Sequence, residues 1–276
     1  MSGRGGTILE EIIAARHRRL EEAETRVPLA ALELAAESRI ERRDFTQALS
    51  AGGSRSDRGR LHVIAELKRA SPSRGLLREA YRRQDIARGY EAAGASALSV
   101  LTEEQFFMGS LEDLKAVRES VRVPILRKDF ILGSYQVLES VAAGADALLL
   151  IVAVLSEKDL RDLIALSNRL RIAALVEVHT AEELDRAVQA GARIIGVNNR
   201  DLKTMEVTTE TSFRLRSKVP SGCLAVSESG IKTAADLERL AEAGFNAALV
   251  GERLMLAENP GEELSELLGK TVPSRR

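Results

Sequence analysis

Charged and amide side chains recur at the ends of apolar, β-branched segments of this chain. Five segments end in this way, at residues 63–68, 125–128, 174–177, 194–200 and 225–228. A buried strand gains nothing from an ionised group at its end. The five endings therefore indicate that the strands converge on one polar site, which is the arrangement of a parallel barrel enzyme.

Four ionisable residues at these ends are of the types that transfer protons. Because side chains alternate across a strand, Glu66 and Lys68 share one face, while Lys128 and Glu177 end two later strands. In a closed barrel all four project toward the same cavity, where partial desolvation shifts pKa values. Glu66 and Lys68 alone could form a salt bridge at the rim. Together with Lys128 and Glu177, they favour an acid–base set.

Polar groups after the other strands suit an anionic ligand. Asn198 and Arg200 share one face and offer an amide and a guanidinium to a hydroxyl or carboxylate. In the turn at residues 71–75, Pro72 fixes φ and the serines offer hydroxyl groups. We therefore expect a polar, negatively charged substrate.

The last two strands point to phosphate. Ser227-Glu-Ser-Gly230 follows the seventh strand, and Val250-Gly-Glu252 follows the eighth. Barrels frequently bind phosphate at these places, against backbone N–H groups and a helix N-terminus. Gly230 and Gly251 would let the backbone approach a phosphate closely.

A repeated Ala-Gly pair reveals the elements that must position these residues. The pair occurs at 93–94, 143–144, 190–191 and 243–244, each time before a β-rich run, and a glycine just past a helix end can redirect the chain into a strand. The intervals are about twice one βα unit, so a further unit is expected inside each. The predicted strands are residues 61–68, 97–101, 124–128, 147–152, 172–177, 194–197, 224–228 and 247–250. Eight βα units predict a closed (β/α)8 TIM barrel, because an open sheet of that size would have two edges to protect.

A helical segment precedes the barrel. Residues 8–20 and 29–34 show helical spacing, and Arg16, Arg18 and Arg19 are interleaved with glutamates, which favours a solvated helix face over a nucleic-acid patch. Small and polar residues at 50–59 predict a connecting loop. We therefore expect a single domain over residues 1–276, with an N-terminal helical extension and loop at 1–60 and the barrel at 61–270.

Composition narrows the class of protein. With 40 basic and 41 acidic residues, the net charge of −1 does not favour nucleic acid, and no apolar run is long enough to span a bilayer. The N-terminus lacks the apolar region of a secretory signal, and Cys223 is the single cysteine, which fits a reducing cytoplasm. His17, His62 and His179 lack metal-ligand spacing, so we expect them to be packed or solvated and expect no metal.

Five motifs, in order and at barrel spacing, carry a family resemblance. Together the segments at residues 64–73, 99–107, 126–130, 196–202 and 227–230 resemble indole-3-glycerol phosphate synthase. The resemblance runs from the N-terminal extension nearly to the C-terminus. It implies conversion of 1-(2-carboxyphenylamino)-1-deoxyribulose 5-phosphate to indole-3-glycerol phosphate, with loss of carbon dioxide and water, in tryptophan biosynthesis. It also implies that no cofactor is needed and that the partner is this small phosphosugar-anthranilate substrate.

The resemblance assigns roles in catalysis. Lys128 would be the general acid that activates the substrate carbonyl, and Glu228 would hold its ammonium in place. Glu177 and Glu66 would handle protons during dehydration. Lys68 would contact the substrate carboxylate or phosphate and is a second candidate proton donor in the later step.

The resemblance also assigns binding roles. Residues at substrate-binding positions are Ser71, Asn198, Arg200 and Ser229, and those at the phosphate loop are Gly230, Gly251 and Glu252. Glu252 stands where some relatives have a serine, so we expect its backbone N–H to contact phosphate with the carboxylate turned away. An apolar wall for the anthranilate ring would comprise Pro72, Phe107, Phe130 and Leu149, for which ordinary core packing is an equal alternative.

Two other functions are compatible with such a barrel. Phosphoribosylanthranilate isomerase needs a cysteine and aspartate pair, but Cys223 precedes the seventh strand, at the wrong end. A barrel that binds phosphosugar without turnover would need a broken acid–base set, whereas Glu66, Lys68, Lys128 and Glu177 are all present. No outer helix face indicates an interface, so we expect a monomer or a weak homo-oligomer.

Overall fold

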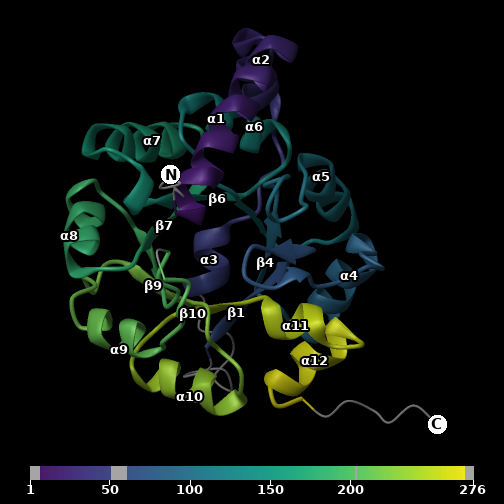
Figure 1. Ribbon diagram of the computed structural model, residues 1–276, viewed down its shortest axis with the longest axis vertical. Coiled ribbons are helices and arrows are strands. Elements are labelled where there is room, and N and C mark those ends of the chain that lie inside the picture. The colour runs from purple at the N-terminus through teal and green to yellow at the C-terminus, as the bar shows by residue number, and fades with distance from the viewer. Residues whose placement is uncertain (1–6, 51–60, 203, 271–276) are drawn as a thin grey trace, which may run out of the picture.

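The computed structural model describes residues 7–50, 61–202 and 204–270, and its centre is a closed barrel of eight parallel strands (Figure 1). The TIM-barrel prediction is confirmed, and every predicted strand agrees with an observed strand to within one residue at each end. The barrel strands are β1 (His62–Leu67), β4 (Ala97–Leu101), β5 (Ile125–Lys128), β6 (Ala147–Ile151), β7 (Ala173–Val178), β8 (Ile194–Asn198), β9 (Leu224–Glu228) and β10 (Ala247–Val250). The connecting loop predicted at 50–59 lies, from residue 51 onward, outside the described residues.

Helices surround the barrel, and α1 and α2 of the N-terminal extension project at one side (Figure 1). The helices are α1 (Ile8–Arg26), α2 (Leu29–Ser38), α3 (Phe45–Ser50), α4 (Arg83–Ala93), α5 (Leu111–Ser120), α6 (Ser134–Ala142), α7 (Glu157–Arg169), α8 (Ala181–Gln189), α9 (Glu210–Arg216), α10 (Ala234–Glu242), α11 (Glu252–Leu256) and α12 (Pro260–Leu267), with a 3₁₀ turn η1 (Val152–Val154). The predicted Ala-Gly corners are confirmed. At the first, for example, Gly94 ends α4 with φ of 99°, a backbone conformation that favours glycine.

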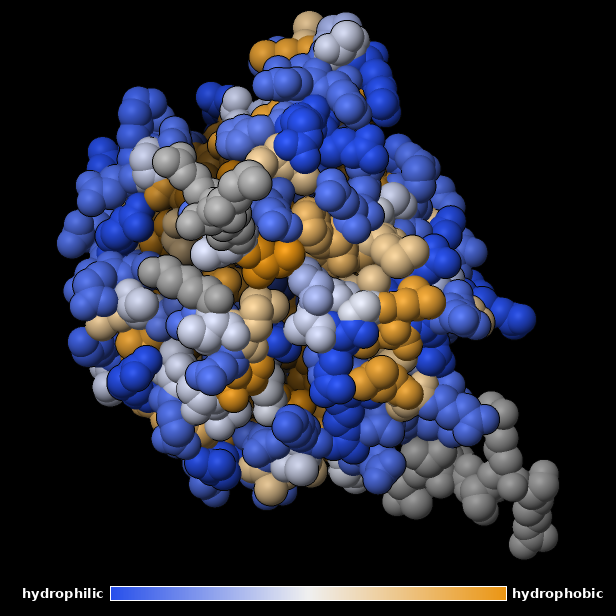
Figure 2. All heavy atoms as spheres, viewed as in Figure 1, coloured by the Kyte–Doolittle hydropathy of each residue, from blue (hydrophilic) through white to orange (hydrophobic). Residues whose placement is uncertain are grey.

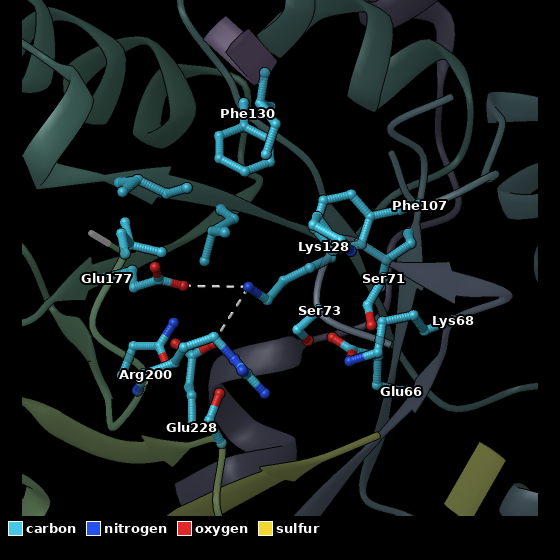
Figure 3. A pocket seen from close by; sticks show the side chains of 18 of the residues that line it. Glu66, Lys68, Ser71, Ser73, Phe107, Lys128, Phe130, Glu177, Arg200 and Glu228 are labelled. Carbon is cyan, nitrogen blue, oxygen red and sulfur yellow. Dashed lines mark hydrogen bonds and ion pairs between the residues drawn. The ribbon is translucent and has the colours of Figure 1, made fainter. Parts of the chain in front are cut away.

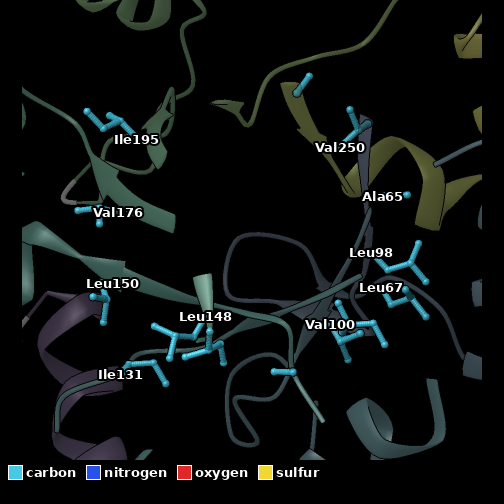
Figure 4. Close-up of a cluster of buried hydrophobic side chains, with 14 of the residues drawn as sticks. Ala65, Leu67, Leu98, Val100, Ile131, Leu148, Leu150, Val176, Ile195 and Val250 are labelled. Atoms are coloured by element: carbon cyan, nitrogen blue, oxygen red, sulfur yellow. The ribbon is translucent and has the colours of Figure 1, made fainter. Parts of the chain in front are cut away.

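Strand alternation separates two buried clusters. The side chains drawn in Figure 4, such as Leu67, Leu98 and Leu148, point from the strands toward the surrounding helices. Their strand neighbours, such as Ile64 and Leu149, fill the barrel interior. The barrel is therefore a packed core, and its polar residues lie at the carboxyl ends of the strands.

The N-terminal extension closes both ends of this core. Phe45 and Leu49 of α3, a helix that the sequence patterns did not predict, pack into the interior cluster. They enter at the amino ends of the strands, since Arg43 just before α3 bonds to Asp146 just before β6. Ile12 of α1 joins the same cluster at the opposite end. The extension is thus part of the barrel's packing.

One expectation for the extension is wrong. Arg18 and Arg19 are exposed, as a solvated face requires, but Arg16 is 8% exposed and its Nη2 lies 2.7 Å from Oδ2 of Asp129. Asp129 is fully buried, and a buried carboxylate needs a cation or hydrogen bonds nearby. Arg16 supplies one such charge across the junction between α1 and the residues after β5, beside Arg127 of β5 at 2.9 Å.

The surface drawn in Figure 2 is mostly hydrophilic, and hydrophobic side chains gather toward its centre, over the strands. None of the helices within the described ranges combines the length and the apolar character needed to cross a membrane.

Candidate active site

A pocket opens at the carboxyl ends of the strands, and all but two of the predicted site residues line it. The exceptions are Gly230 and Gly251. The predicted residues that line the pocket are Glu66, Lys68, Ser71, Pro72, Phe107, Lys128, Phe130, Leu149, Glu177, Asn198, Arg200, Glu228, Ser229 and Glu252. The convergence inferred from the strand endings is therefore what the fold produces.

Lys128 is the central cation of the pocket (Figure 3). Its Nζ lies 3.1 Å from Oε2 of Glu177 and 3.5 Å from Oε2 of Glu228. Burial alone lowers the pKa of Lys128, but the charges of Glu177, Glu228 and Glu66 outweigh burial and raise that pKa above its usual value. Lys128 is thus an ammonium at neutral pH, as a proton donor must be.

The two carboxyl groups beside Lys128 differ in protonation. Burial favours the neutral form of both, but Lys128 and His179 hold the pKa of Glu177 well below its usual range. Burial, reinforced by the charges of Glu177 and Glu66, instead raises the pKa of Glu228 to about 8. Neither oxygen of Glu228 has a hydrogen-bond partner among the described residues. Two carboxyl groups with separated pKa values are typical of acid–base sites.

Glu66 and Lys68 contact each other within the same pocket. Nζ of Lys68 lies 2.7 Å from Oε1 of Glu66, and the Ser99 hydroxyl donates to Oε2 of Glu66 at 3.4 Å. Glu66 is only 3% exposed, so the pair is not an exposed rim salt bridge.

Glycines leave room for these carboxyl groups. A Cβ at Gly251 would overlap the Glu66 carboxylate, and one at Gly196 would overlap that of Glu228. A side chain at either position would have to displace that carboxyl group. Gly251 therefore has a steric role that the predicted phosphate contact does not include.

The carboxylate of Glu252 is oriented differently from the sequence-based expectation. Its Oε1 lies 3.2 Å from Nη2 of Arg74, and its Oε2 lies 3.6 Å from Nη2 of Arg200. The side chain thus faces the pocket between two guanidinium groups and is not turned away, because these cations attract it. Arg74 belongs to the predicted polar turn but was not singled out. It lies between two short strands, β2 (Ala70–Ser71) and β3 (Gly75–Leu76).

The turn after β9 has an unusual backbone. Ser229 has φ of 67° and Gly230 has φ of 82°, so two consecutive residues adopt the left-handed region. This conformation is costly for serine. The Asn199 side chain stabilises it by donating to the Ser229 carbonyl at 2.9 Å.

An aromatic pair forms the apolar side of the pocket (Figure 3). The rings of Phe107 and Phe130 have centroids 6.3 Å apart and an interplanar angle of 41°. Phe130 and Leu149 also belong to the interior core. These side chains therefore both pack in the core and line the pocket, and their contact with an anthranilate ring stays a prediction.

Sequence reasoning missed two further parts of the site. Ile8, Leu9 and Ile12 of α1 line the pocket, and helical spacing predicted their helix but not its position. His179 was expected to be solvated or packed, yet its Nε2 lies 3.3 Å from Oε1 of Glu177. Its signal was its place two residues after Glu177, on the same face of the strand. No cluster able to hold a metal ion occurs within residues 7–50, 61–202 and 204–270.

Comparisons with solved structures support the fold alone. The 3-hexulose-6-phosphate synthase from Salmonella typhimurium aligns with a TM-score of 0.60 at 13% identity, over 75% of this chain and 98% of the other. The thiamine phosphate pyrophosphorylase from Pyrococcus furiosus aligns with a TM-score of 0.55 at 16% identity, over 76% of this chain and 96% of the other.

Comparisons of sequence define the family. The indole-3-glycerol phosphate synthase family model matches residues 9–267. The enzyme of that name from Polaromonas naphthalenivorans is 48% identical over 263 residues, which cover 95% of this chain and 99% of the relative. The one from Carboxydothermus hydrogenoformans is 42% identical over 261 residues, covering 94% and 99%. The chain therefore belongs to the indole-3-glycerol phosphate synthase family, as the five motifs indicated.

Proposed function

We propose that the protein converts 1-(2-carboxyphenylamino)-1-deoxyribulose 5-phosphate to indole-3-glycerol phosphate, carbon dioxide and water. The observation that carries the proposal is the Lys128 ammonium, which lies between Glu177 and Glu228 in the pocket. Membership of the family supports the same reaction.

Ring closure is the step that uses Lys128. The aromatic carbon bearing the carboxylate attacks the substrate carbonyl, and Lys128 donates a proton to the carbonyl oxygen as negative charge develops there. Holding the two reacting carbons together in one bound substrate removes much of the entropic barrier. A preorganised donor at the oxygen contributes about 2.7–4 kcal/mol of transition-state stabilisation. Loss of carbon dioxide then restores the aromatic ring. Throughout this step Glu228 holds the Lys128 ammonium in place.

Dehydration uses the remaining ionisable groups. The hydroxyl formed from the carbonyl leaves as water with a proton from Lys128 or Lys68. Ionised Glu177, with Glu66, accepts the proton that is lost as the new ring double bond forms. The low pKa of Glu177 keeps it in the ionised form that a base requires.

The substrate's three parts match three sides of the pocket. We assign the phosphate to Ser229, Gly230 and the backbone at Gly251 and Glu252, next to the N-terminus of α11. The anthranilate ring would lie against Phe107 and Phe130. Its carboxylate and the sugar hydroxyls would contact Lys68, Ser71, Asn198 and Arg200, with Pro72 and Leu149 completing the apolar wall.

We also propose the cellular and assembly state. A single-domain monomer or weak homo-oligomer in the cytoplasm fits the balanced charge and the lone cysteine. The isomerase alternative is not favoured, because Cys223 precedes β9 at the amino end of the barrel, where its Sγ donates to the Ala192 carbonyl at 3.3 Å.

The direct test is to incubate the purified protein with the substrate, without added metal, and follow indole absorbance. We expect rapid formation of indole-3-glycerol phosphate, and a fall in kcat of about 100- to 1,000-fold for Lys128→Ala. Lys115→Ala is the matched control, because that lysine is 49% exposed and pairs with Glu112 on α5. No product from folded wild type that binds phosphate would contradict the proposal and favour the non-catalytic barrel.

A further inference from the structure

His179 occupies a buried position directly behind the carboxylate of Glu177. It follows the last residue of β7, and its side chain is 11% exposed. Its Nε2 lies 3.3 Å from Oε1 of Glu177, an ion-pair distance, and makes no hydrogen bond within the described residues. His179 does not line the pocket. It therefore meets the site only through Glu177.

A second carboxylate fixes the other side of the imidazole ring. Oε2 of Glu183 lies 3.1 Å from Nδ1 of His179 and accepts the His179 backbone N–H at 2.6 Å. Glu183 lies in the first turn of α8, where the Thr180 hydroxyl accepts its N–H at 3.2 Å. The ring is thus held against the N-terminus of a capped helix, which leaves it little freedom to rotate.

The ring can satisfy both carboxylates only as a cation. Each ring nitrogen faces a carboxylate oxygen, so both nitrogens must carry a proton to donate. Burial lowers the pKa of His179, but the hydrogen bonds and charges of Glu177 and Glu183 outweigh burial and raise it to about 10. His179 therefore stays positively charged through the neutral range, unlike a solvated histidine.

The two oxygens of Glu177 consequently have different neighbours. Oε1 faces His179, whereas Oε2 faces Nζ of Lys128 at 3.1 Å. A carboxylate held by one oxygen cannot swing its other oxygen away from the pocket. A base oriented by a third group is a recurrent arrangement in enzymes.

We propose that His179 is a positioning residue, which holds one oxygen of Glu177 so that the other is directed at Lys128 and the substrate. The inference rests on the proposed role of Glu177 as the base. Glu183 completes a chain that runs from α8 through His179 and Glu177 to Lys128.

Several other charged groups face this chain and set its pH dependence. Lys128 of β5 attracts the Glu177 carboxylate, while Glu228 of β9 repels it and Glu66 of β1 repels Glu228. Asn198 of β8 adds a hydrogen bond that favours the ionised form of Glu177. Lys128 is retained when His179 is replaced, so Glu177 keeps one cation and loses the other.

The test is His179→Gln, which removes the charge and keeps at most one donor. We expect kcat to fall about 10- to 100-fold, as when hydrogen-bond partners that orient metal ligands are removed, with KM changed much less. Losing a cation raises the pKa of Glu177, so the acid limb of the kcat profile should move to higher pH. His62→Gln is the matched control, because that partly buried histidine lies at the start of β1, with Nδ1 2.9 Å from the Ser96 hydroxyl.

Two further variants separate the possible failures. Glu183→Gln keeps the imidazole but removes the charge that holds its Nδ1, so kcat should also fall. The double variant, His179→Gln with Glu183→Gln, should lose less activity than the product of the two single losses, because both residues act through Glu177. Glu183→Gln also serves as the test of the positioning role if His179→Gln does not fold. Glu177→Gln should lose most activity, and if it does not, the proposed role of Glu177 fails. If Glu177→Gln is inactive while His179→Gln and Glu183→Gln keep the wild-type kcat and pH profile, only the positioning role is overturned.

Discussion

Each end of the barrel buries a carboxyl group beside cations, but with different surroundings. At the amino end, Asp146 accepts four hydrogen bonds, from Arg39 and Arg118 at 2.7 Å each and from two backbone N–H groups at 3.1 Å each. At the carboxyl end, Glu228 has no hydrogen bond from the described residues and only the Lys128 ammonium at 3.5 Å. A fully satisfied carboxylate stabilises a fold, whereas an unsatisfied one costs stability and keeps a proton available.

The largest effect expected from this comparison is on stability, at Asp146. Asp146→Asn leaves Arg39 and Arg118, which are 11% and 12% exposed, without their counter-charge. We expect a loss of about 3–5 kcal/mol in unfolding free energy. Urea unfolding measures it, and kcat of the folded fraction should be unchanged. Asp162→Asn, at an exposed pair with Lys158, is the control and should cost less than about 1 kcal/mol. An equally small loss for Asp146→Asn would mean that the hydrogen bonds of Asp146 do not stabilise the fold as this comparison requires.

Glu228→Gln should show the opposite pattern. The amide resembles the neutral form of Glu228, which predominates near pH 7 because the pKa of Glu228 is about 8. Folding of wild type near pH 7 requires Glu228 to take up a proton, which the amide avoids, so we expect the unfolding free energy of the variant to equal or exceed that of wild type. The amide cannot ionise as Glu228 can when the charge at Lys128 changes, so the ammonium loses that support and kcat should fall about 100-fold, the lower end for groups in an acid–base set. Steady-state kinetics and urea unfolding of the same samples give both numbers. If Glu228→Gln were unstable but fully active, Glu228 would have the stabilising role that we assign to Asp146.

The pH dependence of stability sharpens the same contrast. The pKa of Glu228 is about 8 in the folded state, above the value of about 4.3 for an unfolded glutamate. The folded state thus binds more protons between these values, and the contribution of Glu228 to stability is lost as pH rises through about 8. From pH 5.5 to pH 8.5, the unfolding free energy should therefore decrease by more in wild type than in Glu228→Gln. Parallel curves for the two proteins would contradict the raised pKa.

The amino acid sequence predicts much of the fold and of this site, for a physical reason. Strand alternation places Glu66 and Lys68 on one face, and the Ala-Gly corners set where strands begin, so local pattern is enough for both. Contacts between distant segments are not encoded locally. The burial of Arg16 depends on Asp129, more than a hundred residues away, and the plug formed by Phe45 and Leu49 depends on the shape of the finished barrel.

The sequence also did not predict how some side chains are oriented. The sequence places Glu252 at the start of α11, but the direction of its carboxylate depends on Arg74 and Arg200, which come from two other loops. His179 likewise shows no role until β7 sets its ring beside Glu177. In both cases the missing information was the position of an opposite charge in three dimensions.

Glu252 provides the smallest expected effect and a second contrast with Asp146. Its carboxylate is 29% exposed and lies 3.2 and 3.6 Å from two guanidinium groups, so it pairs with cations that a substrate anion could otherwise reach. Glu252→Gln removes a negative charge beside the proposed phosphate position. We expect KM for the substrate and the inhibition constant of inorganic phosphate both to fall about two- to tenfold at low ionic strength. That range corresponds to a few tenths to about 1.4 kcal/mol, as for a partly screened charge.

Added salt should shrink this gain, because screening weakens interactions between exposed charges. Glu258→Gln is the control, since that exposed glutamate lies outside the pocket. An increase in KM for Glu252→Gln would mean that the carboxylate holds Arg74 and Arg200 in the geometry that binds substrate. Glu252 would then resemble Asp146, as a carboxylate that fixes arginines in place, and the division between the two ends of the barrel would apply only to the residues around Lys128.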